Sequence, residues 1–434
     1  MVNHIRRLNR QDADFESQLK SLLERPEERD GALSSTVADI IKTVRHEGDE
    51  AVLRYTRSLD RHTAETISDL TVERDTLEAA LDTLDPALAE ALKTAASRIE
   101  QYHQHQLVSD WGYEDEYGNH LGQRILAMSR VGLYVPGGKA SYPSSVLMNG
   151  IPAKVAGVEE IIMVVPAPEG ALSEVVLAAA ALAGVTRVFT IGGAQAIAAL
   201  AYGTPSIPRV DKIVGPGNRF VAEAKRQVFG LVGIDMVAGP SEVLVIADGS
   251  VHPEWVAVDL FSQAEHDEQA QALLIATDAD YLDAVEKALK AELPKMDRAQ
   301  IIQASLENRG AFIQVETLED AFALSNQIGP EHLELAIENA GNYLDRVKVA
   351  GAVFVGGDTC ESLGDYCAGP NHVLPTSSTA RFSSPLGVYD FQKRTSVVHC
   401  SASGASALGD VASVLARAES LTAHARSAEL RVKK

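Results

Sequence analysis

Two pairs of neighbouring side chains could bind a metal ion or transfer protons. Gln263 and His266 lie three residues apart near the end of an expected helix, so both could face one ion. A histidine at a helix C-terminus more often interacts with the helix dipole, so this pair alone is a weak signal. Glu331 and His332 follow a Gly-Pro turn. Because imidazole titrates near neutrality and burial raises the pKa of a carboxyl group, this second pair fits either catalytic proton transfer or a surface charge pair.

Further candidates lie in the last quarter of the chain. Residues 356–385 are rich in Gly, Ser, Pro and Thr, and a segment of this length and composition predicts a functional loop rather than a simple connection. Asp365 and His372 lie in this loop. Glu419 and His424 lie in an expected helix whose pattern by itself is that of an ordinary protein surface.

These candidates need a scaffold, and the pattern of apolar residues predicts one. Residues 12–106 have the spacing of successive helices, and residues 405–428 also have helical spacing. Between them, strands and helices alternate in two series, which predicts parallel, doubly wound sheets in two similar halves. The first series comprises strand 131–135, a helix to residue 156, strand 161–165, helix 173–183, strand 187–191 and helix 194–201, and the second comprises strand 242–247, helix 253–266, strand 272–276 and helix 279–293.

Three glycine-rich turns are candidates for binding a dinucleotide. The segment from Gly215 to Gly217 has only two of the three glycines of the usual fingerprint, and no strand leads clearly into an acidic ribose ligand. The turns at 137–138 and 192–193 could bring backbone amides close to a pyrophosphate at a helix start. Turn packing alone explains these glycines equally well.

Composition excludes several classes of partner. The chain has 60 acidic and 39 basic residues and a formal net charge of −21, which repels nucleic acids and anionic membrane surfaces. The first 15 residues lack the apolar stretch of a signal peptide, and the most apolar run, residues 175–185, is too short to span a bilayer. The three cysteines do not form a disulfide framework or a C-x-x-C metal motif, so we expect a reducing compartment and a cytoplasmic protein.

The ordered set of motifs resembles histidinol dehydrogenase over almost the whole chain. The matching motifs are Val-Gly-Leu-Tyr134-Val-Pro-Gly-Gly, Gly-Gly-Ala-Gln195, Gly-Pro-Gly-Asn218, Gly-Pro-Ser241-Glu, Ser-Gln263-Ala-Glu-His266, Gly-Pro-Glu331-His332, Gly-Asp365-Tyr, Asn-His372-Val and Glu419-Ser-Leu-Thr-Ala-His424. Many family members have glycine where this chain has Asp267, directly after a metal-ligand position, but this residue is neither a ligand nor a base.

The resemblance implies an activity, its cofactors and the role of each residue. Family members oxidise L-histidinol to L-histidinaldehyde and then to L-histidine with two NAD molecules, the final steps of histidine biosynthesis. His332 would accept the alcohol proton, and Glu331 would then activate water. One zinc ion per subunit would be held by Gln263, His266, Asp365 and His424. The substrate would contact these four ligands together with His332, Ser241, His372 and Glu419, whereas Tyr134, Gln195 and Asn218 would contact NAD.

The resemblance also implies an intertwined homodimer in which Glu419 and His424 complete the partner's site. The expected fold is α/β, with two incomplete Rossmann-like, doubly wound domains, a helical N-terminal segment and a small C-terminal helical domain swapped within the dimer. The expected divisions are a helical arm over 1–24, a first Rossmann-like domain over 25–133 and 241–386 with the metal and catalytic residues, a second, NAD-binding domain over 134–240, and a C-terminal domain over 387–434 that reaches the partner subunit.

The sequence is also compatible with three other functions. A related enzyme could keep zinc, NAD and both bases but oxidise another small hydroxy compound, such as a sulfonated diol. A zinc hydrolase would also use a glutamate beside a metal to activate water, but it would need no NAD. A non-catalytic binding protein would tolerate the loss of Glu331 and His332.

Overall fold

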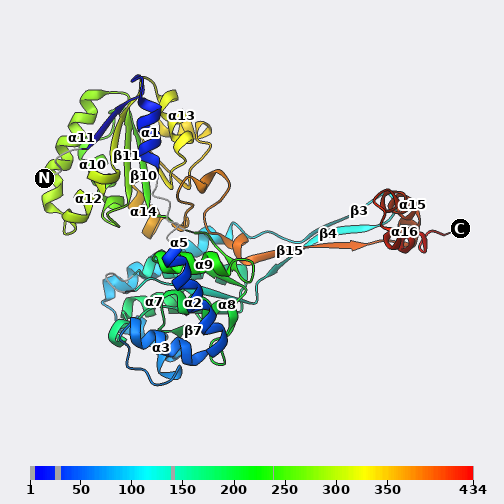
Figure 1. Ribbon diagram of the computed structural model, residues 1–434. Coiled ribbons are helices and arrows are strands. Elements are labelled where there is room, and N and C mark those ends of the chain that lie inside the picture. Colours follow the sequence, from blue (N-terminus) through cyan, green and yellow to red (C-terminus); the bar gives the residue numbers. More distant parts are fainter. Residues whose placement is uncertain (1–4, 25–30, 138–141, 238, 434) are drawn as a thin grey trace.

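The computed structural model describes residues 5–24, 31–137, 142–237 and 239–433 and contains two lobes and a long projecting arm (Figure 1). Each lobe is built around a six-stranded sheet, and a separate three-stranded sheet forms the arm. The expected α/β fold with two doubly wound halves is therefore confirmed. None of the helices in the described ranges is long and apolar enough to cross a membrane.

The first lobe contains an entirely parallel sheet covered on both faces. Its three central strands are buried at every position, as expected for parallel strands between two layers of helices. In spatial order the strands are β1 (Arg6–Asn9), β12 (Ala311–Gln314), β11 (Gln271–Ala276), β10 (Glu242–Ala247), β13 (His332–Ala336) and β14 (Ala352–Val355). One face packs against α10 (Pro253–Ala264), α11 (Ala279–Glu292) and α12 (Ala299–Arg309), and the other against α1 (Phe15–Leu23) and α13 (Leu318–Ile328).

The second lobe has the same architecture with shorter strands. Its strands are β2 (Thr71–Val72), β7 (Arg187–Phe189), β6 (Glu160–Val164), β5 (Arg130–Tyr134), β8 (Lys212–Val214) and β9 (Gly233–Ile234), and only β2 is antiparallel to its neighbour. One face packs against α4 (Arg74–Thr83), α5 (Pro86–Gln104), α6 (Pro143–Ala156) and α7 (Glu174–Leu182). The other face packs against α2 (Gly31–Glu47), α3 (Asp49–Leu59), α8 (Gly193–Tyr202) and α9 (Arg219–Val228).

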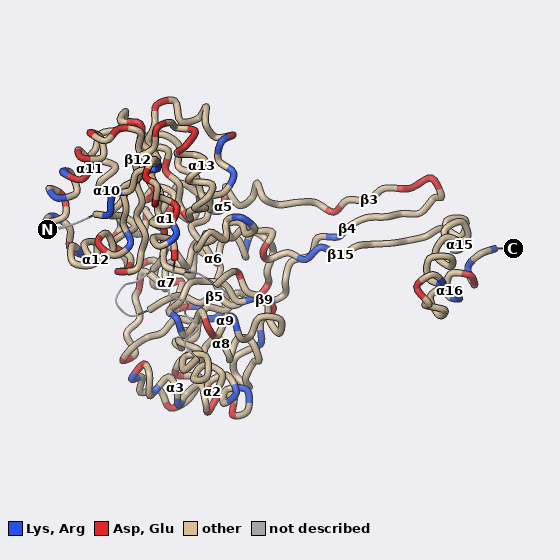
Figure 2. The backbone as a smooth tube through the Cα atoms, turned by 45° about the horizontal axis from the view of Figure 1, so that its top comes forward, with Lys and Arg blue, Asp and Glu red and all other residues tan. Residues whose placement is uncertain are grey.

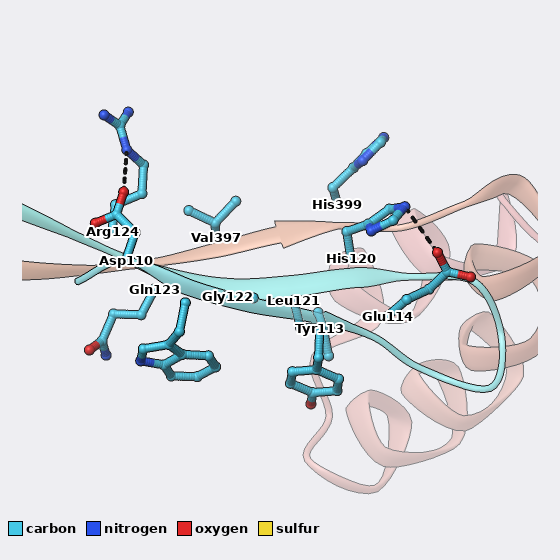
Figure 3. Close-up of a pocket in the computed structure, with 12 residues that line it drawn as sticks. Asp110, Tyr113, Glu114, His120, Leu121, Gly122, Gln123, Arg124, Val397 and His399 are labelled. Atoms are coloured by element: carbon cyan, nitrogen blue, oxygen red, sulfur yellow. Dashed lines mark ion pairs between the residues drawn. The ribbon is translucent and has the colours of Figure 1, made fainter.

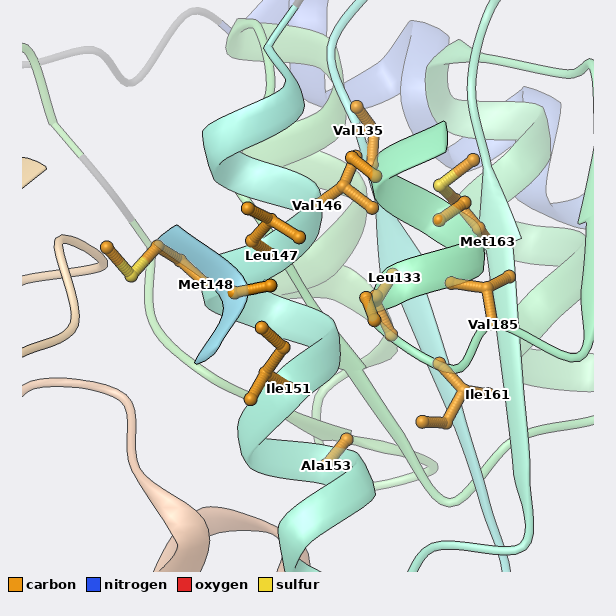
Figure 4. Close-up of a cluster of buried hydrophobic side chains, with 14 of the residues drawn as sticks. Leu133, Val135, Val146, Leu147, Met148, Ile151, Ala153, Ile161, Met163 and Val185 are labelled. Atoms are coloured by element: carbon orange, nitrogen blue, oxygen red, sulfur yellow. The ribbon is translucent and has the colours of Figure 1, made fainter. Parts of the chain in front are cut away.

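Figure 4 shows part of the first of these layers, where α6 packs on the sheet. Val146, Leu147 and Ile151 of α6 lie against Leu133 of β5 and Met163 of β6, and all five side chains are buried. This layer packs against β5, and β5 ends at Tyr134, one of the residues expected to contact the cofactor.

The packing groups the chain differently from the expected domain boundaries. Residues 31–104 supply α2–α5, which pack on the second sheet, whereas we expected residues 25–133 to belong with 241–386. The reason is the apolar face of α2, which packs against α8 and α9 of the second lobe. The N-terminal segment, which we expected to be a separate helical element over residues 1–24, instead contributes β1 to the edge of the first sheet.

The arm combines two distant parts of the chain. Strands β3 (Trp111–Glu114) and β4 (His120–Ala127) pair antiparallel, and β15 (Gln392–His399) completes the sheet on the other side of β4. Helices α15 (Ala402–Ala418) and α16 (Thr422–Glu429) pack on each other at its far end (Figure 2). The helical C-terminal tail was expected, but the three arm strands were not.

A shallow pocket on this arm is unrelated to the expected site. His120 and His399 stack on one face of the sheet with ring centroids 5.8 Å apart, and His120 Nε2 lies 3.5 Å from Glu114 Oε2 (Figure 3). None of the candidate site residues lines this pocket.

Candidate functional site

The expected catalytic pair lies where two central strands of the first sheet begin. Helix α13 ends at Gly329, whose left-handed backbone (φ +65°) lets the chain turn back into β13. His332 then pairs beside Val243 of the neighbouring strand β10. The backbone N–H of Glu242 donates to Glu331 Oε2 at 2.9 Å, and His332 Nδ1 lies 3.0 Å from the Glu242 carbonyl oxygen. Both members of the pair are thus buried and held by the start of β10.

The second half of the site comes from the end of α10. Gln263 is fully buried, and its Nε2 lies 2.9 Å from His332 Nδ1. His266 follows one turn later, where the helix ends. The expected metal ligand Gln263 therefore touches the expected base directly.

A short helix completes the buried cluster. Helix α14 (Glu361–Tyr366) carries Asp365, whose Oδ1 lies 3.5 Å from His332 Nε2. Glu361 is one turn earlier on the same helix, and its backbone N–H donates to Glu334 Oε1 at 2.7 Å. Ligand atoms of His332, Glu361 and Asp365 all lie within 4.8 Å of one another, which is close enough to hold a metal ion.

The carboxyl groups determine the protonation of His332. Burial lowers the pKa of His332, but the charges of Glu361 and Glu331 and the contact with Asp365 outweigh burial and raise the pKa to about 10. Burial raises the pKa of Asp365, but the hydrogen bond and charge of His332 lower it below its ordinary value. Burial also raises the pKa of Glu361 well above its usual range. His332 and Asp365 therefore form the charged pair of the site.

His372 and His266 belong to the same electrostatic neighbourhood. Burial lowers the pKa of each, and the charge of Asp365 raises it in part. The loop of His372 is fixed by its neighbour Asn371, whose Nδ2 donates to the Met148 carbonyl oxygen of the second lobe at 2.7 Å. This loop thereby connects the two lobes at the site.

The buried polar atoms around His332 fit a divalent cation. Gln263 Oε1, His372 Nε2 and Glu361 Oε2 are buried and have no hydrogen-bond partner among the described residues. Unsatisfied buried polar atoms are rare because each one costs free energy. These nitrogen and oxygen donors are the types that zinc accepts, although such a set also suits other divalent metals.

The remaining candidates separate into those near the cluster and those far from it. Ser241 lies just before Glu242 and is half-buried, so it belongs to the same strand end. Glu419 follows α15 and His424 lies on α16, and both side chains are exposed at the end of the arm. Helices α15 and α16 lie at the far end of the arm (Figure 1), so within one chain Glu419 and His424 are far from the buried cluster.

The expected cofactor residues lie on the second lobe. The hydroxyl of buried Tyr134, at the end of β5, accepts the Gly193 N–H at 3.1 Å where α8 begins. Gln195 is buried in the first turn of α8, and its Oε1 has no hydrogen-bond partner within the described ranges. Asn218 caps α9 by accepting the N–H groups of Phe220 and Val221. Gly138 of the expected glycine turn lies outside the described residues.

Two buried acids of the site were missed by reasoning from the sequence. Glu361 stands four residues before Asp365, and Glu334 two residues after His332. Residues four apart share a helix face, and residues two apart share a strand face. These spacings could have identified both acids once the elements were assigned.

Comparisons with known proteins agree with this geometry. The family model described as histidinol dehydrogenase matches residues 23–432. A histidinol dehydrogenase of Pseudomonas aeruginosa is 60% identical over 428 residues, covering 99% of this chain and 97% of the relative. One of Neisseria gonorrhoeae is 59% identical over 429 residues, covering 99% of this chain and 100% of the relative. The crystal structure of histidinol dehydrogenase from Elizabethkingia anophelis matches with a TM-score of 0.92 and 36% identity, covering 99% of this chain and 98% of that one. The chain belongs to the histidinol dehydrogenase family.

Proposed function

We propose that the protein oxidises L-histidinol to L-histidine in two successive hydride transfers to NAD, at a zinc site in the first lobe. Membership of the family makes the chain an oxidoreductase that acts on a CH–OH group. The observation that carries the detailed proposal is the buried arrangement in which Gln263 and Asp365 lie on opposite ring nitrogens of His332.

The metal would be held by Gln263, His266 and Asp365 together with His424 of the partner subunit. A zinc ion held by these residues would supply a Lewis acid that orients the substrate, and its positive charge would offset the carboxyl groups that raise the pKa of His332. The unsatisfied Gln263 Oε1 supports this assignment.

His332 and Glu331 perform the two proton transfers. Nδ1 of His332 donates to the Glu242 carbonyl oxygen and so fixes the ring, which leaves Nε2 as the nitrogen that accepts the proton of the substrate hydroxyl. Glu331 is held by the Glu242 N–H and takes the proton of the water that hydrates the aldehyde. The hydrated aldehyde is again an alcohol, so His332, once it has released the first proton to solvent, accepts a hydroxyl proton of the hydrate as the second hydride leaves to NAD.

The other expected contacts complete substrate and cofactor binding. Ser241 and His372 border the buried cluster, and Glu419 of the partner subunit closes it from outside. NAD, which accepts each hydride, would bind to the second lobe through Tyr134, Gln195 and Asn218. The first two residues lie at the carboxyl end of the second sheet or the helix start beside it, where nucleotides bind in such folds.

The arm supports a homodimer in which each subunit completes the site of the other. Val411, Val414 and Leu415 of α15 are 56%, 69% and 61% exposed, which is unfavourable for a monomer in water. These exposed apolar side chains at the end of the arm would be buried against a second copy. We place the enzyme in the cytoplasm.

Chelation and metal restoration test this proposal. With L-histidinol and NAD, the purified protein should form NADH, lose this activity on treatment with a chelator, and regain it with zinc. NADH formed with a sulfonated diol but not with L-histidinol would instead indicate a related enzyme. No NADH with either compound, together with metal-dependent ester or amide cleavage, would indicate a hydrolase.

A further inference from the structure

The strand order of the second sheet indicates where an acceptor for the ribose hydroxyls of a nucleotide would be expected. From β5 the chain runs outward to β6 and β7 and then returns to β8 on the other side of β5. Nucleotides bind at the carboxyl ends of strands beside such a reversal, and an acidic residue after the second strand usually accepts hydrogen bonds from the adenosine ribose. The second strand here is β6.

The acid that follows β6 in the sequence does not occupy the position of a ribose acceptor. Glu169 lies in the turn after this strand, is exposed, and pairs with Arg61 at 3.1 Å. Asp60 takes its place from another part of the chain. It ends α3, and its backbone carbonyl oxygen accepts the Glu169 N–H at 3.0 Å, so its carboxyl group lies beside the β6 turn.

Asp60 has one buried carboxyl oxygen that nothing in the described part of the chain satisfies. Its Oδ2 has no hydrogen-bond partner there, and burial raises the pKa of the carboxyl group above its ordinary value although His62 lowers it. Gln195 Oε1 is also buried and unsatisfied. The Tyr134 hydroxyl lies near Asp60 and the start of α8. Its pKa is raised to about 12 by burial and, in smaller part, by the charge of Asp60. A ligand that supplies hydroxyl donors would satisfy these oxygens.

We propose that Asp60 accepts hydrogen bonds from the adenosine ribose of NAD and excludes NADP. This inference rests on the proposed use of a nicotinamide cofactor and adds a residue that selects it. In NADP a phosphate replaces the 2′-hydroxyl, so its negative charge would lie against the Asp60 carboxylate and the hydroxyl donor would be lost.

The test compares cofactor binding by the wild-type protein and by Asp60→Asn. Calorimetry gives Kd for NAD, NADP and NAD lacking the adenosine 2′-hydroxyl, and steady-state assays give kcat/KM. Asp60→Asn should weaken NAD binding about tenfold or more and reduce the preference for NAD over NADP by at least that factor, since hydrogen bonds to charged groups have this strength. Loss of the 2′-hydroxyl should weaken binding about tenfold in the wild type but little in Asp60→Asn.

Glu169→Gln is the matched control because it removes a nearby exposed carboxylate that does not face the ribose. It should leave the ratio of the NAD and NADP affinities unchanged. An unchanged ratio in Asp60→Asn would overturn the inference. If that variant does not fold, equal wild-type affinity for NAD and its 2′-deoxy form would overturn it as well. Failure of the wild type to bind or reduce NAD would contradict the proposed function itself.

Discussion

Gln263 Nε2 lies 2.9 Å from Nδ1 of His332, and both side chains are almost fully buried. The contact connects the end of α10 with the start of β13, so the expected metal ligand and the expected base share one rigid unit. It also turns Nε2 of His332 toward Asp365, 3.5 Å away. In the proposed mechanism, metal binding and proton transfer are therefore coupled through a single imidazole ring.

Substitutions on the two sides of this contact should separate metal binding from proton transfer. Gln263→Leu should lose both zinc and activity, because a hydrocarbon side chain cannot coordinate a metal. His332→Gln should retain zinc while kcat falls by about 10²- to 10⁴-fold, the usual contribution of a general base. Metal analysis of the purified variants and NADH assays measure both effects.

The same variant tests whether His332 is itself a metal ligand, because its ligand atoms lie close to those of Glu361 and Asp365. If His332→Gln is purified without zinc, His332 is itself a ligand and the separation of roles is contradicted. Gln303→Leu, on the half-buried side of α12, serves as a control and should retain both zinc and activity.

Mixed dimers should reveal the exchange of the arm. His332→Gln and His424→Ala variants should each be nearly inactive. When they are unfolded and refolded together, half of the dimers should be mixed, and each mixed dimer should contain one intact site, so roughly a quarter of wild-type activity should return.

A pair of variants that both alter the arm provides the control. Glu419→Ala and His424→Ala should not complement each other, because every site in their mixed dimer receives a defective arm. Full complementation in this control, or none in the first mixture, would contradict an arm that completes the partner's site.

The buried Lys225–Asp235 pair should matter more for stability than the exposed pairs. Lys225 Nζ donates to the Gly215 carbonyl oxygen at 2.9 Å and to Asp235, and Asp235 Oδ2 accepts the Gly215 N–H at 2.8 Å. Their side chains are 4% and 1% exposed. Lys225→Met should destabilise the protein by about 3–5 kcal/mol in urea unfolding, because it leaves a buried charge unpaired.

Lys290→Met is the matched comparison for this prediction. Lys290 pairs with Glu286 at 2.7 Å, but its side chain is 48% exposed. Its substitution should change the free energy of unfolding by less than about 1 kcal/mol. Equal effects of the two substitutions would show that the Lys225–Asp235 pair does not hold the Gly215 turn.

His103 should make stability depend on pH. It is fully buried, and burial lowers its pKa below the ordinary value although hydrogen bonds to backbone groups raise it in part. The unfolded chain therefore takes up a proton near pH 6.5 that the folded protein does not bind. Its contribution to stability is present above about pH 6.5 and is lost as the pH falls toward the folded-state pKa.

His103→Gln should remove this part of the pH dependence. Urea midpoints measured at pH 7.5 and pH 5.5 should differ less in the variant than in the wild type. His46→Gln, at an exposed position on α2, should behave as the wild type. If His103→Gln retains the full wild-type difference, His103 is not the group responsible.

Local patterns predicted the central strands because burial on both faces leaves a clear signal. Strand β10 was expected over residues 242–247 and is found there, and α10, β11 and α11 begin and end within two residues of expectation. The arm strands gave no such signal. Seven of the eight residues of β15 are exposed, so no apolar alternation marks the strand. Its pairing with β4, across more than 260 residues, is also a non-local property.

The site was predictable where a motif marks it and not where only packing does. Glu331, His332, Gln263 and Asp365 were all proposed from the sequence, and the structure places them together. Glu361 was missed because its place depends on the path of α14 beside β13, and its spacing from Asp365 becomes a signal only once a helix is assigned there. Asp60 was missed for the same reason, since it reaches the β6 turn from the end of α3.

The number of NADH molecules formed per L-histidinol consumed tests the central claim most directly. Absorbance at the end of the reaction, with NAD in excess and L-histidinol limiting, should give two NADH per substrate and L-histidine as the product. One NADH per substrate, with the aldehyde accumulating, would contradict the second oxidation at this site, and no NADH would contradict the account as a whole.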